Sequence, residues 1–313
     1  MHVMAGVMLD ASGRVLLAQR PPGKHLAGFW EFPGGKIDAG EMPLAALARE
    51  LREELGVEVD TSVATPLIRI PWCYGERELL LDAWRVDAWQ GTPRSLEGQA
   101  LQWLIPDEVD PTTLAPADLP ILQALRLAPY YSITPAHVQP NAFAAWLARL
   151  SDAIEQGERL LQLRLPLWPV GRVRDLASAL LPLARRYRAS LLLNGDIEGA
   201  RQLGAGIGVQ LRASQLGELS QRPLPFSQPV GASCHNSAEL AQASYLQADF
   251  ATLSPVAATA SHADAAPLGW SLFCVLAKDA ALPVYALGGM TREQVQDARA
   301  AGGQGVAGIS GFW

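Results

Sequence analysis

The sequence predicts an α/β protein of two domains, an N-terminal α/β/α sandwich with a mixed sheet and a C-terminal compact (β/α)8 barrel. Three observations lead to this prediction. At 313 residues the chain is long for a single hydrophobic core. Prolines cluster where the pattern changes, between residues 128 and 140. Beyond that point, short apolar runs alternate with helical patterns, which is typical of a parallel sheet. We therefore expect domains at residues 1–128 and 129–313.

The first domain is predicted from short strands and flanking helices. Residues 2–10 and 14–20 have the pattern of a hairpin around the turn at 11–13, and residues 29–32 that of a third short strand. Further strands are expected at 64–72 and 78–89, paired around Tyr74-Gly75, and at 100–105. An amphipathic helix over 119–127 closes the domain.

The second domain contains eight short apolar runs that predict strands. They lie at 130–134, 160–166, 190–196, 206–212, 229–235, 250–256, 283–289 and 305–311. Helical patterns separate most of them, at 141–157, 172–187, 237–246 and 291–302. Eight strand-helix units favour a closed TIM barrel, here with short third and fourth helices.

Composition excludes several classes of protein. The net charge of -6 and the pI near 5.4 argue against a protein that binds nucleic acid polymers. Cys73, Cys234 and Cys274 are too few and too scattered for a disulfide framework or a zinc site. The chain shows neither an apolar run of membrane-spanning length nor the pattern of a signal peptide. We expect a cytoplasmic protein that does not enter membranes.

Residues 43–55 predict a helix with an acidic edge. Apolar residues recur there at intervals of three and four, and Glu50, Glu53 and Glu54 fall on one side of the helix. Like charges placed this way repel one another. Either the edge is solvated, or a divalent cation neutralises it; Mg²⁺ binds carboxylates while keeping water and substrate phosphates as its other ligands.

The residues around this edge decide between the two interpretations. Gly35, five residues, Glu41, seven residues and then residues 49–57, RELREELGV, resemble the complete Nudix box. The resemblance implies an α/β/α sandwich that hydrolyses nucleoside diphosphates linked to another group, with Mg²⁺ or alternatively Mn²⁺ as cofactor. It implies that the metal is held by the Gly34 carbonyl, Glu50, Glu53 and Glu54, with Glu97 as a further ligand. Glu53 or Glu97 would take the proton from the attacking water.

Residues 19–36 resemble the MutT subgroup of this family, whose members remove pyrophosphate from 8-oxo-dGTP. The resemblance places Asp118 over the base, where the best-known members carry an amide. Because an ionised carboxylate only accepts hydrogen bonds, Asp118 must be protonated or pair with ring N–H groups alone; alternatively it caps the following helix. Arg20 is expected to contact phosphate. Phe29, like its neighbour Trp30, either stacks on the base or belongs to the core.

The second half resembles thiamine phosphate synthase and its relative TenI. The resemblance rests on residues 162–164 (QLR), 193–194 (LN), 234–236 (CHN), 254–256 (SPV) and the run PVYALGGMT. It implies a phosphate-binding corner and a ligand site made of Gln162, Arg164, Asn194, Gly288, Gly289, Gly308 and Ser310. His235 would act in acid–base chemistry as in TenI, or serve the structure alone.

Departures from the synthase pattern change this expectation. Pro166 replaces a lysine, Gly195 replaces an aspartate next to Asn194, residues 211–216 lack a further metal-binding aspartate, and His262 replaces another lysine. A diphosphate leaving group needs its charge neutralised, so we expect no synthase activity. The barrel would instead bind thiamine or thiazole phosphate, or mediate oligomerisation; the oligomeric state itself is not predicted. The fusion leaves a further alternative, in which the Nudix domain hydrolyses thiamine-related diphosphates.

Overall fold

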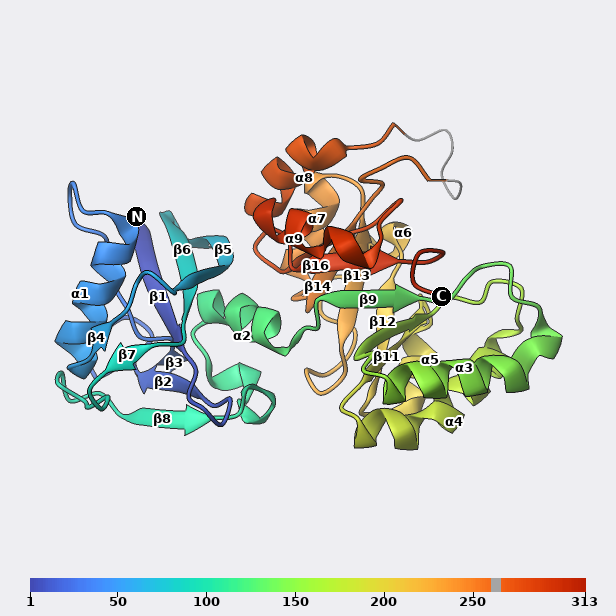
Figure 1. Cartoon of the computed structure of the whole chain (residues 1–313), viewed down its shortest axis with the longest axis horizontal. Helices are drawn as coiled ribbons and strands as arrows, with labels where there is room; N and C mark the ends of the chain where they lie inside the picture. The colour runs from blue at the N-terminus through green and yellow to red at the C-terminus, as the bar shows by residue number, and fades with distance from the viewer. Residues whose placement is uncertain (260–265) are drawn as a thin grey trace. The chain divides into compact units, whose positions relative to one another are not determined.

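The computed structural model describes residues 1–259 and 266–313, and it divides into two compact units, Met1–Arg126 and Leu127–Trp313 (Figure 1). The strands of the first unit are β1 (His2–Met8), β2 (Val15–Gln19), β3 (Trp30–Glu31), β4 (Glu58–Val59), β5 (Thr65–Tyr74), β6 (Arg77–Val86), β7 (Trp89–Gln90) and β8 (Leu101–Leu104). Its helices are α1 (Pro43–Leu55) and α2 (Leu119–Arg126), with short 3-10 turns at Pro106–Glu108, Pro111–Thr113 and Pro116–Asp118.

The sheets of the first unit are mixed, as predicted. The order β1-β6-β5 combines a parallel β1·β6 pair with the antiparallel hairpin β5·β6, while β3-β2-β8 and β4-β7 are antiparallel. Helix α1 contacts β1, α2 contacts β5, and Figure 1 shows the two helices on opposite sides of β1 and β6. The α/β/α sandwich is confirmed.

The predicted hairpin between the first two strands is wrong. Strand β1 pairs with β6, and β2 pairs with β3 and β8; the two segments meet at their ends alone, through the bridge Leu9↔Val15 and the bonds between Asp10 and Arg14. The turn after Asp10 exists, with Gly13 N–H donating to the Asp10 carbonyl. Apolar alternation predicted the strands correctly, but it carries no information on the partner of each strand.

The second unit is a closed parallel barrel in the order β10-β11-β12-β13-β14-β15-β16-β9. Its strands are β9 (Tyr130–Ile133), β10 (Leu160–Leu163), β11 (Ser190–Asn194), β12 (Ile207–Leu211), β13 (Val230–Cys234), β14 (Phe250–Leu253), β15 (Val284–Ala286) and β16 (Gly305–Gly308). Its helices are α3 (Phe143–Glu155), α4 (Val170–Arg186), α5 (Ile197–Leu203), α6 (Ala213–Leu216), α7 (Ser237–Tyr245), α8 (Gly269–Lys278) and α9 (Val295–Ala300), with 3-10 turns at Pro140–Ala142 and Arg292–Gln294. All eight predicted strands and the short third and fourth helices are confirmed.

Large side chains fill the interior of the barrel. Tyr131, Phe250 and Tyr285 pack edge to face or tilted, with ring centroids 5.1 to 6.0 Å apart. The Tyr131 hydroxyl donates to Gln210 Oε1 at 2.9 Å, so the buried phenol is satisfied. The interior is therefore a packed core, and a ligand can enter only at the strand ends. In the part of the chain that the structure describes, no helix is long and apolar enough to span a bilayer.

Candidate active site and barrel pocket

The turn before α1 is held against strand β1 by backbone hydrogen bonds. Met4 N–H donates to the Gly35 carbonyl and Gly6 N–H to the Pro33 carbonyl, each at 2.8 Å. Gly34 adopts φ +146, and a Cβ there would lie 2.2 Å from the Met4 carbonyl oxygen. Only glycine tolerates this close approach of two backbones. At the other end of the helix, Gly56 caps α1 in the left-handed conformation expected from the sequence.

Two carboxyl groups of α1 face this turn. The Glu54 carboxylate accepts a hydrogen bond from Gly34 N–H at 3.1 Å. The Glu50 carboxyl group lies against Gly35, where an added Cβ would fall within 2.5 Å of both its oxygens. The missing side chain of Gly35 thus makes the space that the Glu50 carboxylate occupies.

Arg49 organises the remaining acidic groups of the box. Its guanidinium forms a two-pronged ion pair with Glu41, with distances of 3.0 and 2.9 Å. The same group donates to Glu50 at 2.9 Å and to Glu53 at 3.1 Å. These carboxylates raise the pKa of Arg49 further, so it stays charged. Glu53 nevertheless keeps 54% of its side chain exposed, which leaves it free to meet solvent and substrate.

The loop that carries Glu97 is tied to the end of α1. Gln99 Nε2 donates to the Glu54 carbonyl at 3.0 Å, while Gln99 Oε1 accepts from Glu97 N–H at 3.0 Å. The Glu97 carboxylate pairs with Lys24 at 3.0 Å. Buried Gln99 therefore positions Glu97 near the acidic edge, a role that no spacing rule in the sequence predicts.

The charges of the site act on Glu54. Burial, opposed by the Gly34 N–H, raises its pKa to about 7, and the like charges of Glu31, Glu97 and Glu50 add to the rise. Glu50, Glu54 and Glu97 are thus close enough to repel one another, although they come from the helix and from a distant loop. Such repulsion is relieved by a bound cation.

The types of side chain at this site, rather than their present positions, fit a divalent cation. Among the described residues, no three His, Cys, Asp or Glu side chains are gathered tightly enough to hold a metal in the observed arrangement. The carboxylates are paired with Arg49 and Lys24 instead. Their oxygen-only donor set and mutual repulsion suit Mg²⁺. Glu50, Glu53, Glu54, Glu97 and the Gly34 carbonyl are the groups that would hold it.

A second acidic pair lies beside the turn, on the side where the base is expected. Asp118 is buried, and its Oδ1 accepts from Phe32 N–H at 2.9 Å rather than capping α2. Burial, and next the charge of Glu31, raise the pKa of Asp118 to about 8. At neutral pH its carboxyl group is therefore mostly protonated, and it can donate as well as accept.

Glu31 was not predicted as a site residue. It forms an ion pair with Arg20, and burial raises its pKa while Arg20 opposes the rise. Arg20 also donates from Nε to the His25 carbonyl at 2.6 Å, so its guanidinium is committed to this corner. The sequence FWEF could have indicated Glu31, because side chains alternate along a strand and Glu31 therefore points to the other face from Trp30 and Phe32. Phe29 and Trp30 are half-buried, and neither belongs to the buried core.

The second candidate site is a pocket of about 300 Å³ at the carboxyl ends of the barrel strands. Of the predicted ligand residues, it brings together Gln162, Arg164, Asn194, His235 and Gly288. Gln162 Nε2 donates to Asn194 Oδ1 at 2.9 Å, which joins the ends of β10 and β11. Arg212, at the end of β12, also lines the pocket and was not predicted.

The residues expected to bind phosphate do not all line this pocket. Gly288 lines the pocket, whereas Gly289, Gly308 and Ser310 do not belong to its lining. A Cβ on Gly308 would lie 2.0 Å from the Phe312 ring, which occupies that position, and Ser310 is exposed. His262 lies outside the described residues.

His235 is held by the neighbouring strand. Its Nδ1 lies 2.9 Å from the Ser254 carbonyl and 3.3 Å from the Ser254 hydroxyl. A carbonyl can only accept, so Nδ1 carries a proton and Nε2 is the acceptor of the neutral ring. Cys234 beside it is fully buried, and burial raises the pKa of its thiol, which keeps it inert.

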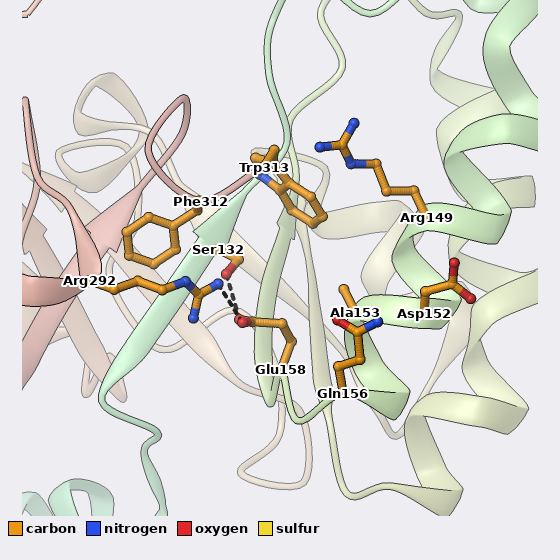
Figure 2. A pocket seen from close by; sticks show the side chains of 9 residues that line it. All are labelled: Ser132, Arg149, Asp152, Ala153, Gln156, Glu158, Arg292, Phe312 and Trp313. Carbon is orange, nitrogen blue, oxygen red and sulfur yellow. Dashed lines mark hydrogen bonds and ion pairs between the residues drawn. The ribbon is translucent and has the colours of Figure 1, made fainter.

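A further cavity of about 470 Å³ lies on the outside of the barrel, beside β9 and α3. Figure 2 shows Arg292 and Ser132 both directed at the Glu158 carboxylate, which accepts a hydrogen bond from each. Arg292 also lies over the rings of Tyr130 and Phe312, at 5.0 and 4.5 Å. Glu158 and Arg292 thus neutralise each other within this cavity.

Fold and site define the class of protein. Residues 4–124 match the NUDIX domain family, and residues 130–312, more than half of the chain, match the thiamine monophosphate synthase family. The chain belongs to both families, as a Nudix domain followed by a thiamine phosphate synthase/TenI-like barrel.

Individual relatives divide between the two halves. CTP pyrophosphohydrolase of Escherichia coli K12 is 42% identical over 123 residues, which is 39% of this chain and 88% of the relative. An 8-oxo-dGTP diphosphatase of Proteus vulgaris is 41% identical over 90 residues, 29% of this chain and 79% of the relative. Thiamine phosphate pyrophosphorylase from Pyrococcus furiosus is 22% identical and covers 58% of this chain and 85% of its own, with a TM-score of 0.45.

Proposed function

We propose that the N-terminal domain is a divalent-metal-dependent pyrophosphohydrolase that converts 8-oxo-dGTP and water into the monophosphate and pyrophosphate. The observation that carries the proposal is that Glu50 lies against Gly35 and Glu54 accepts from Gly34 N–H, while the charge of Glu97, from a distant loop, acts on Glu54. Membership of the Nudix family supports hydrolysis of a phosphoric anhydride.

The residues of the chain have distinct parts in this reaction. When bound, Mg²⁺ neutralises phosphate oxygens and makes water a better nucleophile. Glu53, exposed and oriented by Arg49 at 3.1 Å, takes the proton of the attacking water. Glu97 is the alternative base, and Lys24 holds its carboxylate. The anhydride bond between the α and β phosphates breaks, and pyrophosphate leaves.

The acidic pair supports an oxidised purine as substrate. Guanine presents acceptors at O6 and N7, and oxidation at C8 turns N7 into an N–H donor. A protonated Asp118 donates to O6 and accepts from the new N–H, which an ionised aspartate cannot do. Glu31 adds a second carboxyl group for ring N–H donors.

CTP is the second candidate, because a relative that is 42% identical is a CTP pyrophosphohydrolase. Cytosine presents an amino donor beside a ring-nitrogen acceptor, and a protonated Asp118 satisfies this pair as well. Values of kcat/KM for 8-oxo-dGTP, dGTP, CTP and dCTP decide between the candidates. If the protein releases phosphate from thiamine diphosphate faster than it releases pyrophosphate from any of these nucleotides, its substrate is a thiamine-related diphosphate and neither nucleotide.

The test of the mechanism is Glu53→Gln, with Glu58→Gln as the matched control. Both glutamates are exposed, but Glu58 lies on β4, outside the acidic edge. We expect Glu53→Gln to lose several orders of magnitude in kcat with unchanged thermal stability, and Glu58→Gln to match wild type. Normal hydrolysis by Glu53→Gln would contradict the role of Glu53 as the base. Absence of activity of the wild-type protein on all four triphosphates, with Mg²⁺ or with Mn²⁺, would contradict the proposed function.

For the barrel, we infer that it does not catalyse the synthase reaction. The support is that the positions of the expected lysine and aspartate hold Pro166, which is exposed, and Gly195. Incubation with the pyrimidine diphosphate, thiazole phosphate and Mg²⁺ should yield no thiamine phosphate above background. Turnover at a rate comparable with that of an authentic synthase contradicts the inference.

A further inference from the structure

The pocket at the strand ends of the barrel has an unusual charge balance. Two guanidinium groups, Arg164 and Arg212, line it together with His235. Within residues 1–259 and 266–313, no carboxylate belongs to its lining. A divalent cation, which the synthase resemblance implies, therefore finds no anionic ligand here and two positive charges instead. The described residues do not fit a metal, but they fit an anion.

Arg212 reaches the pocket because of Gly195. A Cβ on Gly195 would lie 2.5 to 2.8 Å from the Arg212 guanidinium, so any larger side chain would displace it. The guanidinium also lies 3.4 Å from the Asn194 carbonyl. Where the synthase pattern has an aspartate next to the asparagine, this chain has the glycine that admits an arginine. The two departures act together, because one removes a negative charge and the other adds a positive one.

The backbone around Arg212 is fixed. Arg212 N–H donates to Gln215 Oε1 at 3.1 Å, and Gln215 Nε2 donates to the Gly195 carbonyl at 3.0 Å. This pair of hydrogen bonds joins the start of α6 to the end of β11. The arginine therefore extends from a rigid position rather than from a free loop.

The nearest aspartate in sequence does not neutralise the pocket. Asp196 is bound by both prongs of Arg174, at 2.7 and 2.8 Å, and its Oδ1 accepts from Gly199 N–H to cap α5. Arg174 is the main reason that the pKa of Asp196 is lowered, and Arg212 contributes only a smaller effect. The charge of Asp196 is thus already matched outside the pocket.

Arg164 supplies the second cation. It follows β10, and its backbone N–H donates to Thr134 Oγ1 at 2.8 Å, which fixes its main chain. Among the described residues, its guanidinium has no carboxylate partner within ion-pair distance. Apolar side chains of Ile133, Leu287 and Ile309 form another part of the lining. The pocket therefore combines a cationic end with an apolar wall.

The resemblance to thiamine phosphate synthase and TenI already implies a ligand that is the phosphate of a small, flat ring. We propose that this pocket holds such a ligand without a divalent cation. Arg164 and Arg212 provide the positive charge that a metal ion provides in the synthase. Guanidinium groups suit phosphate oxygens because they donate two parallel hydrogen bonds. The volume of about 300 Å³ accommodates one small ring with its phosphate.

Isothermal titration of the full chain tests the proposal, with inorganic pyrophosphate, thiazole phosphate and thiamine monophosphate as probes. In EDTA we expect thiazole phosphate to bind most tightly, since thiamine monophosphate carries an extra positive charge and pyrophosphate lacks the ring. Addition of Mg²⁺ should leave the affinity within about twofold, allowing for weak binding of Mg²⁺ to the free phosphate. In EDTA the Nudix site does not interfere, because the proposed phosphate binding there requires the metal. In Mg²⁺, the heat that remains in a double variant, Arg164→Gln with Arg212→Gln, measures the contribution of the Nudix site, and it is subtracted.

Substitutions locate the binding. Arg212→Gln and Arg164→Gln should each weaken thiazole phosphate binding by about tenfold to a hundredfold, the usual effect of losing a charged hydrogen-bond donor. Arg201→Gln is the matched control, since Arg201 is exposed on α5 and pairs with Glu198. Arg212→Lys should retain part of the affinity, which separates loss of charge from loss of structure.

Three results would overturn the proposal: barrel binding that requires Mg²⁺, affinity unchanged in both Arg164→Gln and Arg212→Gln, or no heat of binding with millimolar probe. The inference does not depend on the proposed hydrolase function. Nucleotide hydrolysis should be the same in Arg212→Gln as in wild type, so failure of one proposal leaves the other standing.

Discussion

Substitution of Asp118 by asparagine tests the protonation state on which base recognition depends. The side chains have the same shape, and the amide oxygen can still accept from Phe32 N–H, as Asp118 Oδ1 does at 2.9 Å. Only the titration is removed. In wild type the pKa of Asp118 rises from 3.8 to about 8 on folding, first through burial and then through the charge of Glu31.

The sign and the size of the effect follow from this shift. A raised folded pKa means that the folded state binds the extra proton, so stability is full below pH 3.8 and falls as pH rises through about 8. At about 1.4 kcal/mol per pKa unit, the loss reaches about 3 kcal/mol at pH 6 and about 6 kcal/mol at pH 9. Relative to wild type, Asp118→Asn should therefore gain about 3 kcal/mol between these two pH values.

Hydrogen exchange followed by mass spectrometry measures this difference on peptides of α1 and β3, because a two-domain chain does not unfold in a single transition. Base recognition should follow the same pKa. Wild-type kcat/KM for the preferred nucleotide should fall about fivefold from pH 8 to 9 relative to Asp118→Asn, as the protonated fraction of a donor with a pKa of about 8 falls. The reasoning is refuted if wild type and Asp118→Asn show the same pH dependence from pH 6 to 9, both in local stability and in kcat/KM.

Three further substitutions separate the parts of the Nudix site. Gly35→Ala should lower kcat strongly, because the new Cβ displaces the Glu50 carboxylate from the glycine turn. Thermal unfolding should change little, since the Cβ meets only the flexible end of Glu50. An unchanged kcat would show that catalysis does not need the Glu50 carboxylate at this turn. Gly34→Ala should instead cost more than about 2 kcal/mol of stability, measured by urea unfolding, because its Cβ meets the backbone of Met4 and its φ of +146 disfavours alanine; wild-type stability would contradict this. Gln99→Ala removes the hydrogen bonds of this side chain to the Glu54 carbonyl and Glu97 N–H. Amide hydrogen exchange around Glu97 should therefore become faster, and kcat should fall. Protected amides together with full activity would argue against a positioning role for Gln99.

Local patterns in the sequence were sufficient for most of the fold. The spacing of leucines in α1, the left-handed Gly56 at its end and the eight apolar runs of the barrel each depend on neighbours within a few residues. Strand pairing depends on distant segments, and for this reason the hairpin predicted between residues 2–10 and 14–20 is wrong while the local hairpin around Gly75 is right.

The candidate site divides in the same way. The sequence by itself determined the acidic edge of α1, the glycine turn before it and the loss of acidic residues in the barrel, because these are properties of residue type and spacing. Only the tertiary structure decided that Glu31 lies close enough to raise the pKa of Asp118, and that Arg212 fills the space left by Gly195. Burial and charge interaction depend on distances between segments that are remote in the chain, and no local pattern encodes those distances.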